Sequence, residues 1–227
     1  MTYVKPPIIL YEPPKRARTD YRIGLAAWTD KSMLEEGHFY PYKTMSAEER
    51  LWWYSRFFDT VEVNSTFYAL PSADTTALWV ARTQPGFLFN VKAYGLLTGH
   101  HLDATRLPEK LRKLLPAAAC STERGRIPST SFGEDARAWV FEELRKGLAP
   151  LRETGKLGYV LFQLAPWVKR SDEAQAQLAR LPRELPDDVI AVEFRNRSWF
   201  GEHLDESLRL LEAHSLTYVS IDVSCVF

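Results

Sequence analysis

The chain has 227 residues, of which 45% are apolar and 26% are charged, the composition of a soluble globular protein with one sizeable core. Lys plus Arg and Asp plus Glu each number 29, so a net charge of zero does not indicate a nucleic-acid or anionic-membrane partner. Two cysteines without metal-ligand spacing, no bilayer-length apolar run and no secretory signal at the start predict a cytoplasmic protein without a membrane partner.

Proline and basic residues dominate the beginning of the chain. Residues 1–20 are therefore predicted to form a flexible N-terminal tail ahead of a single domain at 21–227. The first strand is predicted at 21–28. Ser46 and Glu49 form an S-x-x-E capping box, which predicts that a helix begins at this point.

Strands and helices continue to alternate after this helix. A strand is predicted at 60–68, Ser72 or Asp74 is placed to cap the next helix, and a strand follows at 87–93. The small, polar and turn-prone stretch at 116–133 is predicted to be a surface insertion. The remaining predicted elements are helices at 107–115 and 134–149, a strand at 159–166, a helix at 172–181, a strand at 189–196, a helix at 203–214 and a strand at 218–223.

A polar residue recurs in these apolar strands at a nearly constant interval. Glu62 and Lys92 are 30 positions apart, and so are Gln163 and Glu193. Asp222 follows Glu193 by 29 positions. A strand, a helix and two loops occupy roughly this length, so the pattern predicts repeated βα units that each deliver a polar side chain to one place.

The alternation of side chains within each strand predicts which residues share a face. Val61 and Val63 are expected to face helices, which leaves Glu62 and Asn64 on the opposite, polar face. By the same parity, further residues expected on the polar face are Asn90 with Lys92, Glu193 with Arg195, Ser220 with Asp222, and Gly24, Ala26 and Trp28.

Alternating strands and helices predict a parallel sheet, closed as a (β/α)8 barrel or open and doubly wound. No G-x-G-x-x-G or Walker-type loop follows a predicted strand, which disfavours the open nucleotide-binding fold. Strands that are apolar outward and polar inward favour a TIM-type (β/α) barrel. Because a complete barrel takes roughly 250 residues, we expect an incomplete one with about six of eight strands.

Several motifs in order along the chain resemble the YecE-like family, a TIM-barrel domain family of unknown function. They are G-L-A-A-W (24–28), G-H-F-Y-P (37–41), V-E-V-N-S-T-F-Y (61–68), F-N-V-K-A (89–93), L-L-T-G-H (96–100), L-G-Y-V-L-F-Q-L-A-P-W (157–167) and A-V-E-F-R-N-R-S-W-F (191–200). The resemblance covers about residues 21–222 and implies a TIM barrel but no particular reaction. Family members continue with H-G-R-type and F-N-N-type segments, so the resemblance also implies that the family's C-terminal part is lacking here.

Four charged residues are the predicted catalytic groups: Glu193, Asp222, Glu62 and Lys92. Three carboxylates in one cavity repel one another, which raises the pKa of one of them and creates an acid beside a base. Lys92 and Arg195 are expected to bind an anionic group, and Lys92 is alternatively a Schiff-base nucleophile if it is desolvated. The structural alternative is that these charges form an ion-pair network.

The predicted substrate-binding residues are polar or aromatic side chains near strand ends: Arg195, Asn64, Gln163, Trp28, Tyr68, His100 and Trp199. Amides orient sugar hydroxyls and aromatic rings stack on a ring substrate, whereas buried amides and a plugged barrel mouth are the structural alternatives. No cofactor is assigned, and no residue is assigned as a metal ligand. A divalent ion held by Glu193, Asp222 and His100 or His101 remains an alternative.

These residues predict an enzyme with carboxylate acid–base chemistry on an anionic or sugar-like small molecule, with hydrolase, isomerase and lyase reactions all compatible. The first alternative is a nucleic-acid-associated protein that contacts phosphates through Arg16, Arg18, Arg124 and Arg126. The second is an inactive truncated barrel. The sequence does not indicate an oligomeric state.

Overall fold

The computed structural model describes residues 21–35, 39–115 and 125–221. Its central element is a six-stranded sheet in the order β1-β2-β3-β6-β7-β8, in which every neighbouring pair is parallel. The strands are β1 (Gly24–Leu25), β2 (Thr60–Val63), β3 (Leu88–Lys92), β6 (Leu157–Gln163), β7 (Ile190–Glu193) and β8 (Thr217–Tyr218). The predicted α/β class with a parallel sheet is therefore confirmed.

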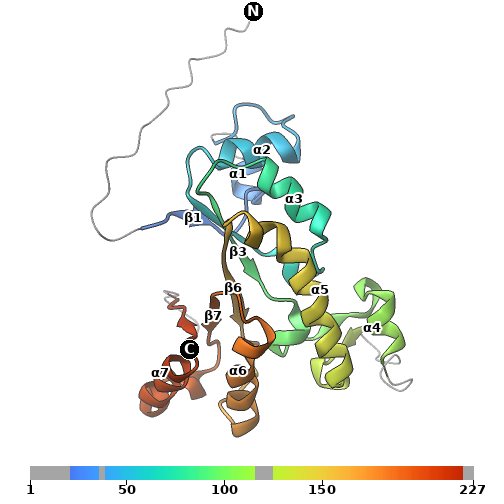
Figure 1. The fold of residues 1–227 in the computed structure, drawn as a ribbon, viewed down its shortest axis with the longest axis vertical. Coiled ribbons are helices and arrows are strands. Elements are labelled where there is room, and N and C mark those ends of the chain that lie inside the picture. Colours follow the sequence, from blue (N-terminus) through green and yellow to red (C-terminus); the bar gives the residue numbers. More distant parts are fainter. Residues whose placement is uncertain (1–20, 36–38, 116–124, 222–227) are drawn as a thin grey trace, which may run out of the picture.

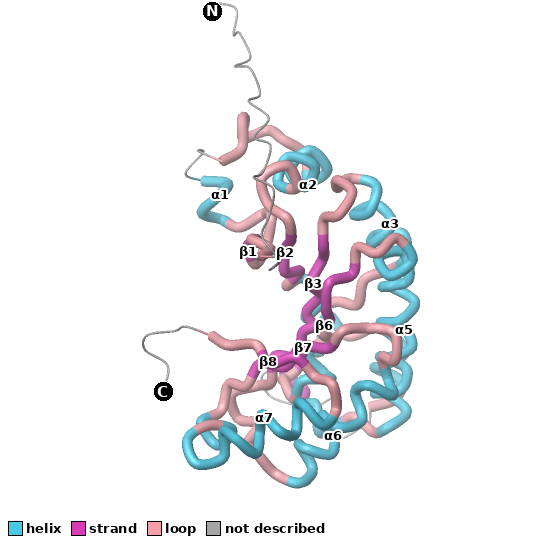
Figure 2. The backbone as a smooth tube through the Cα atoms, turned by 60° about the vertical axis from the view of Figure 1, so that its left-hand side comes forward, coloured by secondary structure: helices cyan, strands magenta, loops and turns pink. Residues whose placement is uncertain are grey.

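The helices cover one face of this sheet. They are α1 (Lys31–Glu35), α2 (Ala47–Tyr54), α3 (Ala73–Ala81), α4 (Glu109–Lys113), α5 (Glu134–Glu153), α6 (Asp172–Glu184) and α7 (Leu204–Ala213) (Figure 1). The strands follow an arc, and α3, α5, α6 and α7 lie on its convex side (Figure 2). Among the described residues β1 and β8 do not pair with each other, so the sheet is open and a closed barrel is not formed.

Two faces of the sheet differ sharply in chemistry. On the face that packs against the helices, Val61, Val91, Val160 and Val192 are completely buried. The opposite face, which we call the inner face, carries the polar side chains. Register confirms that Glu62 lies beside Asn90 and that Gln163 lies beside Glu193 on this face. The period-two alternation of the strands thus separates the core from the polar residues, as predicted.

The sixth strand is an exception to the predicted parity. Thr217 pairs with Ala191 and Tyr218 pairs with Val192, so Tyr218 lies on the helix-covered face. Its ring packs against Phe194 at a centroid distance of 6.2 Å. The prediction places Ser220 and Asp222 on the polar face, and by parity Tyr218 with them, whereas the paired part of β8 has Tyr218 on the helix-covered face and Asp222 lies outside the described residues.

The predicted helix starts are confirmed in detail. The Ser46 hydroxyl accepts from the Glu49 amide at 3.2 Å, and the Glu49 carboxylate accepts from the Ser46 amide at 2.7 Å, which completes the capping box of α2. Ser72 rather than Asp74 caps α3, because its hydroxyl accepts from the Thr75 amide. These caps satisfy amides that have no partner within the helix.

Only part of the predicted insertion at 116–133 is described. Residues 116–124 lie outside the described residues, as does the predicted tail at 1–20. Residues 125–133 are integrated into the domain rather than confined to its surface. The strand β5 (Arg126–Ile127) pairs antiparallel with β4 (Leu102–Asp103), and Ile127 and Phe132 are buried in the core.

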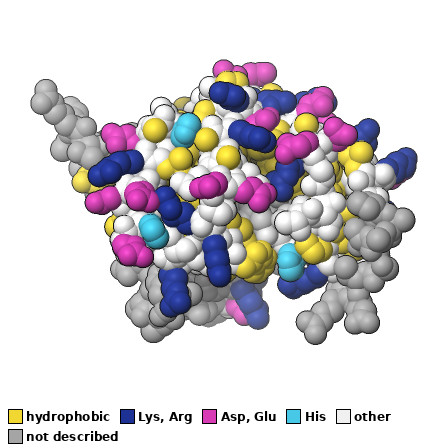
Figure 3. All heavy atoms as spheres, turned by 90° about the horizontal axis from the view of Figure 1, so that it is seen from below, with side chains coloured by type: hydrophobic (Ala, Val, Ile, Leu, Met, Phe, Trp, Pro, Cys, Tyr) yellow, Lys and Arg dark blue, Asp and Glu magenta, His cyan; other side chains and the backbone are white. Residues whose placement is uncertain are grey.

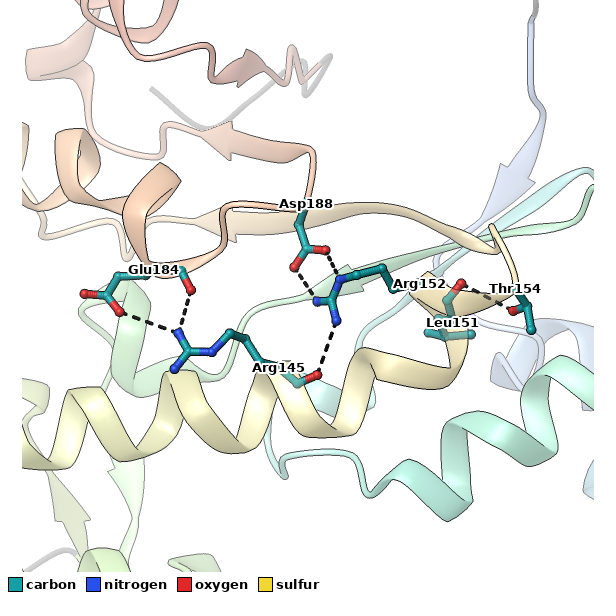
Figure 4. Close-up of polar contacts among 6 residues, drawn as sticks. All are labelled: Arg145, Leu151, Arg152, Thr154, Glu184 and Asp188. Carbon is teal, nitrogen blue, oxygen red and sulfur yellow. Dashed lines mark hydrogen bonds and ion pairs between the residues drawn. The ribbon is translucent and has the colours of Figure 1, made fainter.

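Helix α5 extends beyond its predicted end at 149 and is tied to the following βα unit by two arginines. Arg152 donates to both carboxylate oxygens of Asp188 at 2.7 and 2.8 Å, and Arg145 donates to the Glu184 carbonyl at 2.7 Å (Figure 4). The Arg145 guanidinium also lies 3.8 Å from the Glu184 carboxylate. These contacts fix α5 against the end of α6 and the approach to β7.

The described helices include none with the length and apolarity needed to cross a bilayer. On the face seen in Figure 3, basic and acidic side chains are interspersed among apolar ones.

Candidate functional site

The carboxyl ends of four neighbouring strands bring the candidate site together on the inner face. Glu62 comes from β2, Lys92 from the end of β3, Gln163 from the end of β6 and Glu193 from the end of β7. Lys92 pairs in register with Leu161, two residues before Gln163. Side chains two residues apart share a face in a strand, so the four polar groups converge as their spacing predicted.

Glu193 is held tightly by its neighbours. The side-chain nitrogen of Gln163 lies 3.0 Å from each of its carboxylate oxygens, and Arg195 Nε donates to Oε1. Glu193 is only 4% exposed. A buried carboxylate that accepts from an amide and a guanidinium has a fixed position and orientation. Gln163 and Arg195 therefore orient Glu193.

Arg195 keeps part of its hydrogen-bonding capacity. Its Nε is used by Glu193, whereas its two terminal nitrogens bond to no described residue. The side chain is 31% exposed. Arginine presents five donors in a planar fork, so the remaining donors can bind an anionic group of a ligand.

Glu62 and Lys92 have opposite charges and are both half-buried. Burial raises the pKa of Glu62, while the positive charge of Lys92 pulls that pKa down. Burial lowers the pKa of Lys92, while the negative charges of Glu62 and Glu193 pull it up. In both residues burial favours the neutral form, which is the condition for exchanging a proton near neutral pH.

The Lys92 ammonium has no hydrogen-bonding or ion-pair partner among the described residues. Its Nζ lies 5.3 Å from the centroid of the Phe67 ring. Phe67 belongs to the short 3-10 helix η1 (Ser65–Phe67) that follows β2. An amine that is partly desolvated and unpaired is available to a ligand.

Tyr159 is a further residue of the site that the sequence interpretation missed. Burial raises the pKa of its phenol, and the charges of Glu62 and Glu193 raise it further. The phenol therefore stays protonated and can donate a hydrogen bond. The available signal was strand parity, because Tyr159 lies four residues before Gln163 in the same strand.

His100 lies close to the same charges. Burial, assisted by the positive charges of Lys92, His101 and Arg195, lowers the pKa of the His100 imidazole to about 4. Its Nδ1 lies 2.8 Å from the Thr98 hydroxyl, and its ring meets Phe67 edge-on at 4.8 Å. The sequence placed His100 on a loop, and the structure adds that it is a neutral imidazole near Lys92.

A cavity of about 450 Å³ opens on the inner face next to these groups. Glu62 and Tyr159 contribute to its wall, together with Asn90, Gly24 and Ala26. Lys92 is not part of the wall and lies two residues beyond Asn90 toward the strand end. The cavity is large enough for a small ligand that touches Glu62 and Tyr159.

Asn64 has a structural contact as well as a free acceptor. Its side-chain nitrogen donates to the Ala26 carbonyl at 2.8 Å, which joins the segment after β1 to the end of β2. Its side-chain oxygen is buried and has no hydrogen-bond partner among the described residues. Its predicted role in orienting a substrate remains a prediction.

The three predicted aromatic binding residues lie in different surroundings. Trp199 is completely buried, stacked on Phe194 at 4.4 Å, with its indole nitrogen bonded to the Val168 carbonyl. Its predicted contact with substrate is wrong for this structure because neither face of the ring is open. Trp28 packs edge-on against Trp79 of α3 at 5.8 Å, on the helix-covered face rather than the predicted inner face.

Tyr68 is the exposed member of the predicted aromatic set. It is 57% exposed and meets the ring of Phe67 edge-on at 4.9 Å. Trp167 is also exposed, and its indole nitrogen bonds the Gly99 carbonyl beside His100. Tyr68 and Trp167 are thus exposed aromatic residues near the site, in addition to Tyr159 in the cavity wall.

The carboxylate Asp222 and the arginines Arg16, Arg18 and Arg124 lie outside the described residues. Within the described ranges, no three His, Cys, Asp or Glu side chains are grouped so as to hold a metal ion. The predicted alternative of a metal held by Glu193, Asp222 and a histidine remains untested because one of its ligands is not described.

Comparison with protein families identifies one match. Residues 22–225 match the family described as "Protein of unknown function DUF72". A curated relative is the UPF0759 protein YunF of Bacillus subtilis (strain 168), which is 34% identical over 179 residues. The alignment covers 79% of this chain and 52% of that relative.

Solved structures of the same family are similar in fold. A DUF72 family protein from Enterococcus faecalis V583 aligns with a TM-score of 0.62 and 21% identity, over 87% of this chain and 59% of that chain. One from Thermotoga maritima MSB8 aligns with a TM-score of 0.56 and 26% identity, over 82% of this chain and 59% of that chain. This chain therefore spans little more than half the length of the relatives that it matches.

Proposed function

This chain belongs to the DUF72 family, the YecE-like family under another description, and we propose that it acts as an acid–base enzyme on a polar, anionic small molecule. The proposal includes a TIM-type architecture, in which the six parallel strands make up part of a (β/α) barrel with its site at the carboxyl ends of the strands. The family itself supplies no reaction, so the site must support the proposal.

One observation carries the acid–base proposal. Glu62 and Lys92 lie near each other on the inner face, and burial shifts the pKa of each toward the neutral form. A carboxylic acid beside an amine can exchange a proton with a ligand in the adjoining cavity. Perturbed titratable groups beside a cavity are typical of catalytic sites.

The residues have different proposed roles. Glu62 acts as the general acid or base, and Tyr159 donates a hydrogen bond from its phenol. Gln163 and Arg195 position Glu193, whose negative charge stabilises positive charge that develops nearby. Asp222 remains a proposed catalytic group, and Asn64, Tyr68 and His100 remain proposed ligand contacts. Hydrolysis, isomerisation and elimination all use such a set of groups.

A substrate panel tests this proposal. The panel contains chromogenic phosphate esters and glycosides, sugar phosphates and oxo acids. Against any compound that is turned over, Glu62→Gln should lower kcat by about 10²–10⁴-fold, the usual contribution of a general acid or base. Glu202→Gln is the matched control because Glu202 lies on η7 (Gly201–His203) and is highly exposed. Full activity of Glu62→Gln would overturn the assignment.

A further inference from the structure

The most unusual group on the inner face is the amine of Lys92. Lysines that are partly buried ordinarily pair with a carboxylate or donate to backbone carbonyls, as Lys156 does to Val80 and Thr83 in this chain. Lys92 makes neither kind of contact with a described residue, and its amine lies 5.3 Å from the centroid of the Phe67 ring. On β6, the residue that pairs in register with Lys92 is the apolar Leu161. The surroundings therefore partly desolvate the amine and place charges near it, but no described residue bonds it.

We infer that the site accepts a small carbonyl compound with an anionic group, whose carbonyl carbon condenses with Lys92 while Arg195 binds the anion. This inference rests on the proposed acid–base function and specifies its substrate class. The anionic group is a carboxylate or a phosphate, because the planar donor fork of arginine binds both.

The condensation uses groups that are present in the site. The lone pair of the neutral Lys92 amine forms a bond to the carbonyl carbon, and the carbonyl π electrons move to oxygen, which takes a proton from Glu62 or Tyr159. The nitrogen of the resulting carbinolamine carries two protons and a positive charge, and one of these protons leaves with the hydroxyl as water. The lysine nitrogen and the former carbonyl carbon are then joined by a double bond as a protonated imine. Reaction with water reverses these steps and regenerates the amine.

The charges around Lys92 support each stage. Glu62 is near enough to influence the amine electrostatically, and its own pKa is raised by burial, so it can hold the proton that the oxygen needs. Glu193 is the fixed negative charge that compensates the positive imine. Arg195 is also near Lys92 and favours the neutral amine by charge repulsion. Its terminal nitrogens remain open for the ligand's anion.

Trapping with a hydride donor tests the inference. The full chain is incubated at pH 7 with sodium cyanoborohydride and one of four probes: pyruvate, glyoxylate, dihydroxyacetone phosphate or uncharged acetone. The reduced secondary amine is located by proteolysis and mass spectrometry. Lys92 should be labelled by an anionic probe about tenfold or more faster than Lys110, an exposed lysine of α4, because a positioned acid contributes roughly 10²–10⁴-fold. Lys92→Arg should remove this label and leave the label on Lys110.

The probes distinguish the two anion sources. Labelling by the oxo acids alone assigns a carboxylate, and labelling by the phosphorylated ketone alone assigns a phosphate. Acetone should label Lys92 more slowly than the anionic probes, and Arg195→Met should remove that difference. Because Arg195 also holds Glu193, the variant is checked by thermal melting, and the comparison of probes in the unaltered chain stands without it. Equal labelling by acetone and by the anions would overturn the assigned role of Arg195.

Failure of the inference can be separated from failure of the proposed function. If no probe labels Lys92 faster than Lys110 but Glu62→Gln still abolishes turnover on the substrate panel, the carbonyl inference falls and the acid–base function stands. If Lys92 is labelled equally fast with and without the Glu62→Gln substitution, imine formation stands and the assigned role of Glu62 falls. With Glu62 acting as the acid, that substitution should slow labelling about 10²-fold.

Discussion

Gln163 and Glu193 lie side by side on β6 and β7, and the amide nitrogen of Gln163 is 3.0 Å from both carboxylate oxygens of Glu193. The sequence spacing of 30 positions brought these two residues to the same level of adjacent strands. Their contact means that Glu193 is presented to the inner face in one orientation. Several consequences of this arrangement and of its supporting contacts can be measured.

Replacing Gln163 by leucine should destabilise the fold. The buried Glu193 carboxylate would lose one donor and keep only Arg195, which costs about 1–3 kcal/mol in the free energy of unfolding. Urea denaturation measures this change. The additional substitution Glu193→Leu in the same chain should recover part of the loss, since no buried charge is then left under-paired. A Gln163→Leu variant that is as stable as the unaltered chain would contradict this account.

The stability of the chain should depend on pH through Glu62. Burial raises the pKa of Glu62 above its ordinary value of 4.5, against the pull of Lys92 and Arg195, and the neighbouring charge of Glu193 adds to the rise. The folded state then holds this proton more tightly than the unfolded state, so the stability contribution of Glu62 falls as pH rises above 4.5.

Glu62→Gln should therefore gain stability relative to the unaltered chain between pH 4 and pH 7, as followed by thermal melting. Burial lowers the pKa of Lys92, so its contribution to stability changes with pH in the opposite sense, and Tyr159 stays protonated throughout this range. The control Glu202→Gln, at a highly exposed carboxylate, should show no such trend. A difference that is flat or reversed with pH would contradict the assigned environment of Glu62.

Lys156 should be a major contributor to the packing of α3. Its amine donates to the carbonyls of Val80 and Thr83 and to the Thr83 hydroxyl at 2.8–2.9 Å, which satisfies groups at the end of the helix. Lys156→Met should lower the free energy of unfolding by about 1–3 kcal/mol. Lys110→Met, on an exposed position of α4, is the comparison and should be close to neutral. Chemical denaturation of both variants settles the point.

Breaking the pair between Arg152 and Asp188 should have the largest effect on stability. The Asp188 side chain is 1% exposed, and both of its oxygens accept from Arg152 (Figure 4). Arg152→Met would leave this carboxylate buried and unpaired, which costs about 3–5 kcal/mol. Arg183→Met, at an exposed position of α6, serves as the control. Equal unfolding midpoints for the two variants would show that Asp188 finds another partner.

Local sequence signals predicted much of the fold. The capping box at Ser46 and the alternation around Val61 and Glu62 depend on residues close in sequence, and both are confirmed. Such signals fix where a helix begins and which face of a strand is apolar. They do not fix where a sheet stops pairing, and that is why the predicted strand at 21–28 pairs only over Gly24–Leu25.

Contacts between distant residues limited the prediction of the site. Trp199 follows a predicted strand and has the kind of aromatic ring that stacks on ligands. In the structure, however, this ring is enclosed by Phe194 and the loop that carries Val168. In β8, Tyr218 pairs with Val192 and packs near Phe194, a contact between distant residues that no local pattern encodes. The clustering of Glu62, Lys92 and Glu193 was predictable because equal spacing in βα units places strand ends at one level.

The alternation of the strands also makes the site separable from the scaffold. Val61, Val91 and Val192 pack against the helices, while their immediate neighbours Glu62, Lys92 and Glu193 lie on the inner face, where Glu193 is buried and Glu62 and Lys92 are half-buried. An engineer can therefore randomise the half-buried positions Glu62 and Lys92 as a small combinatorial library and screen for new chemistry, while the valines of the core and the Gln163–Glu193 pair are kept.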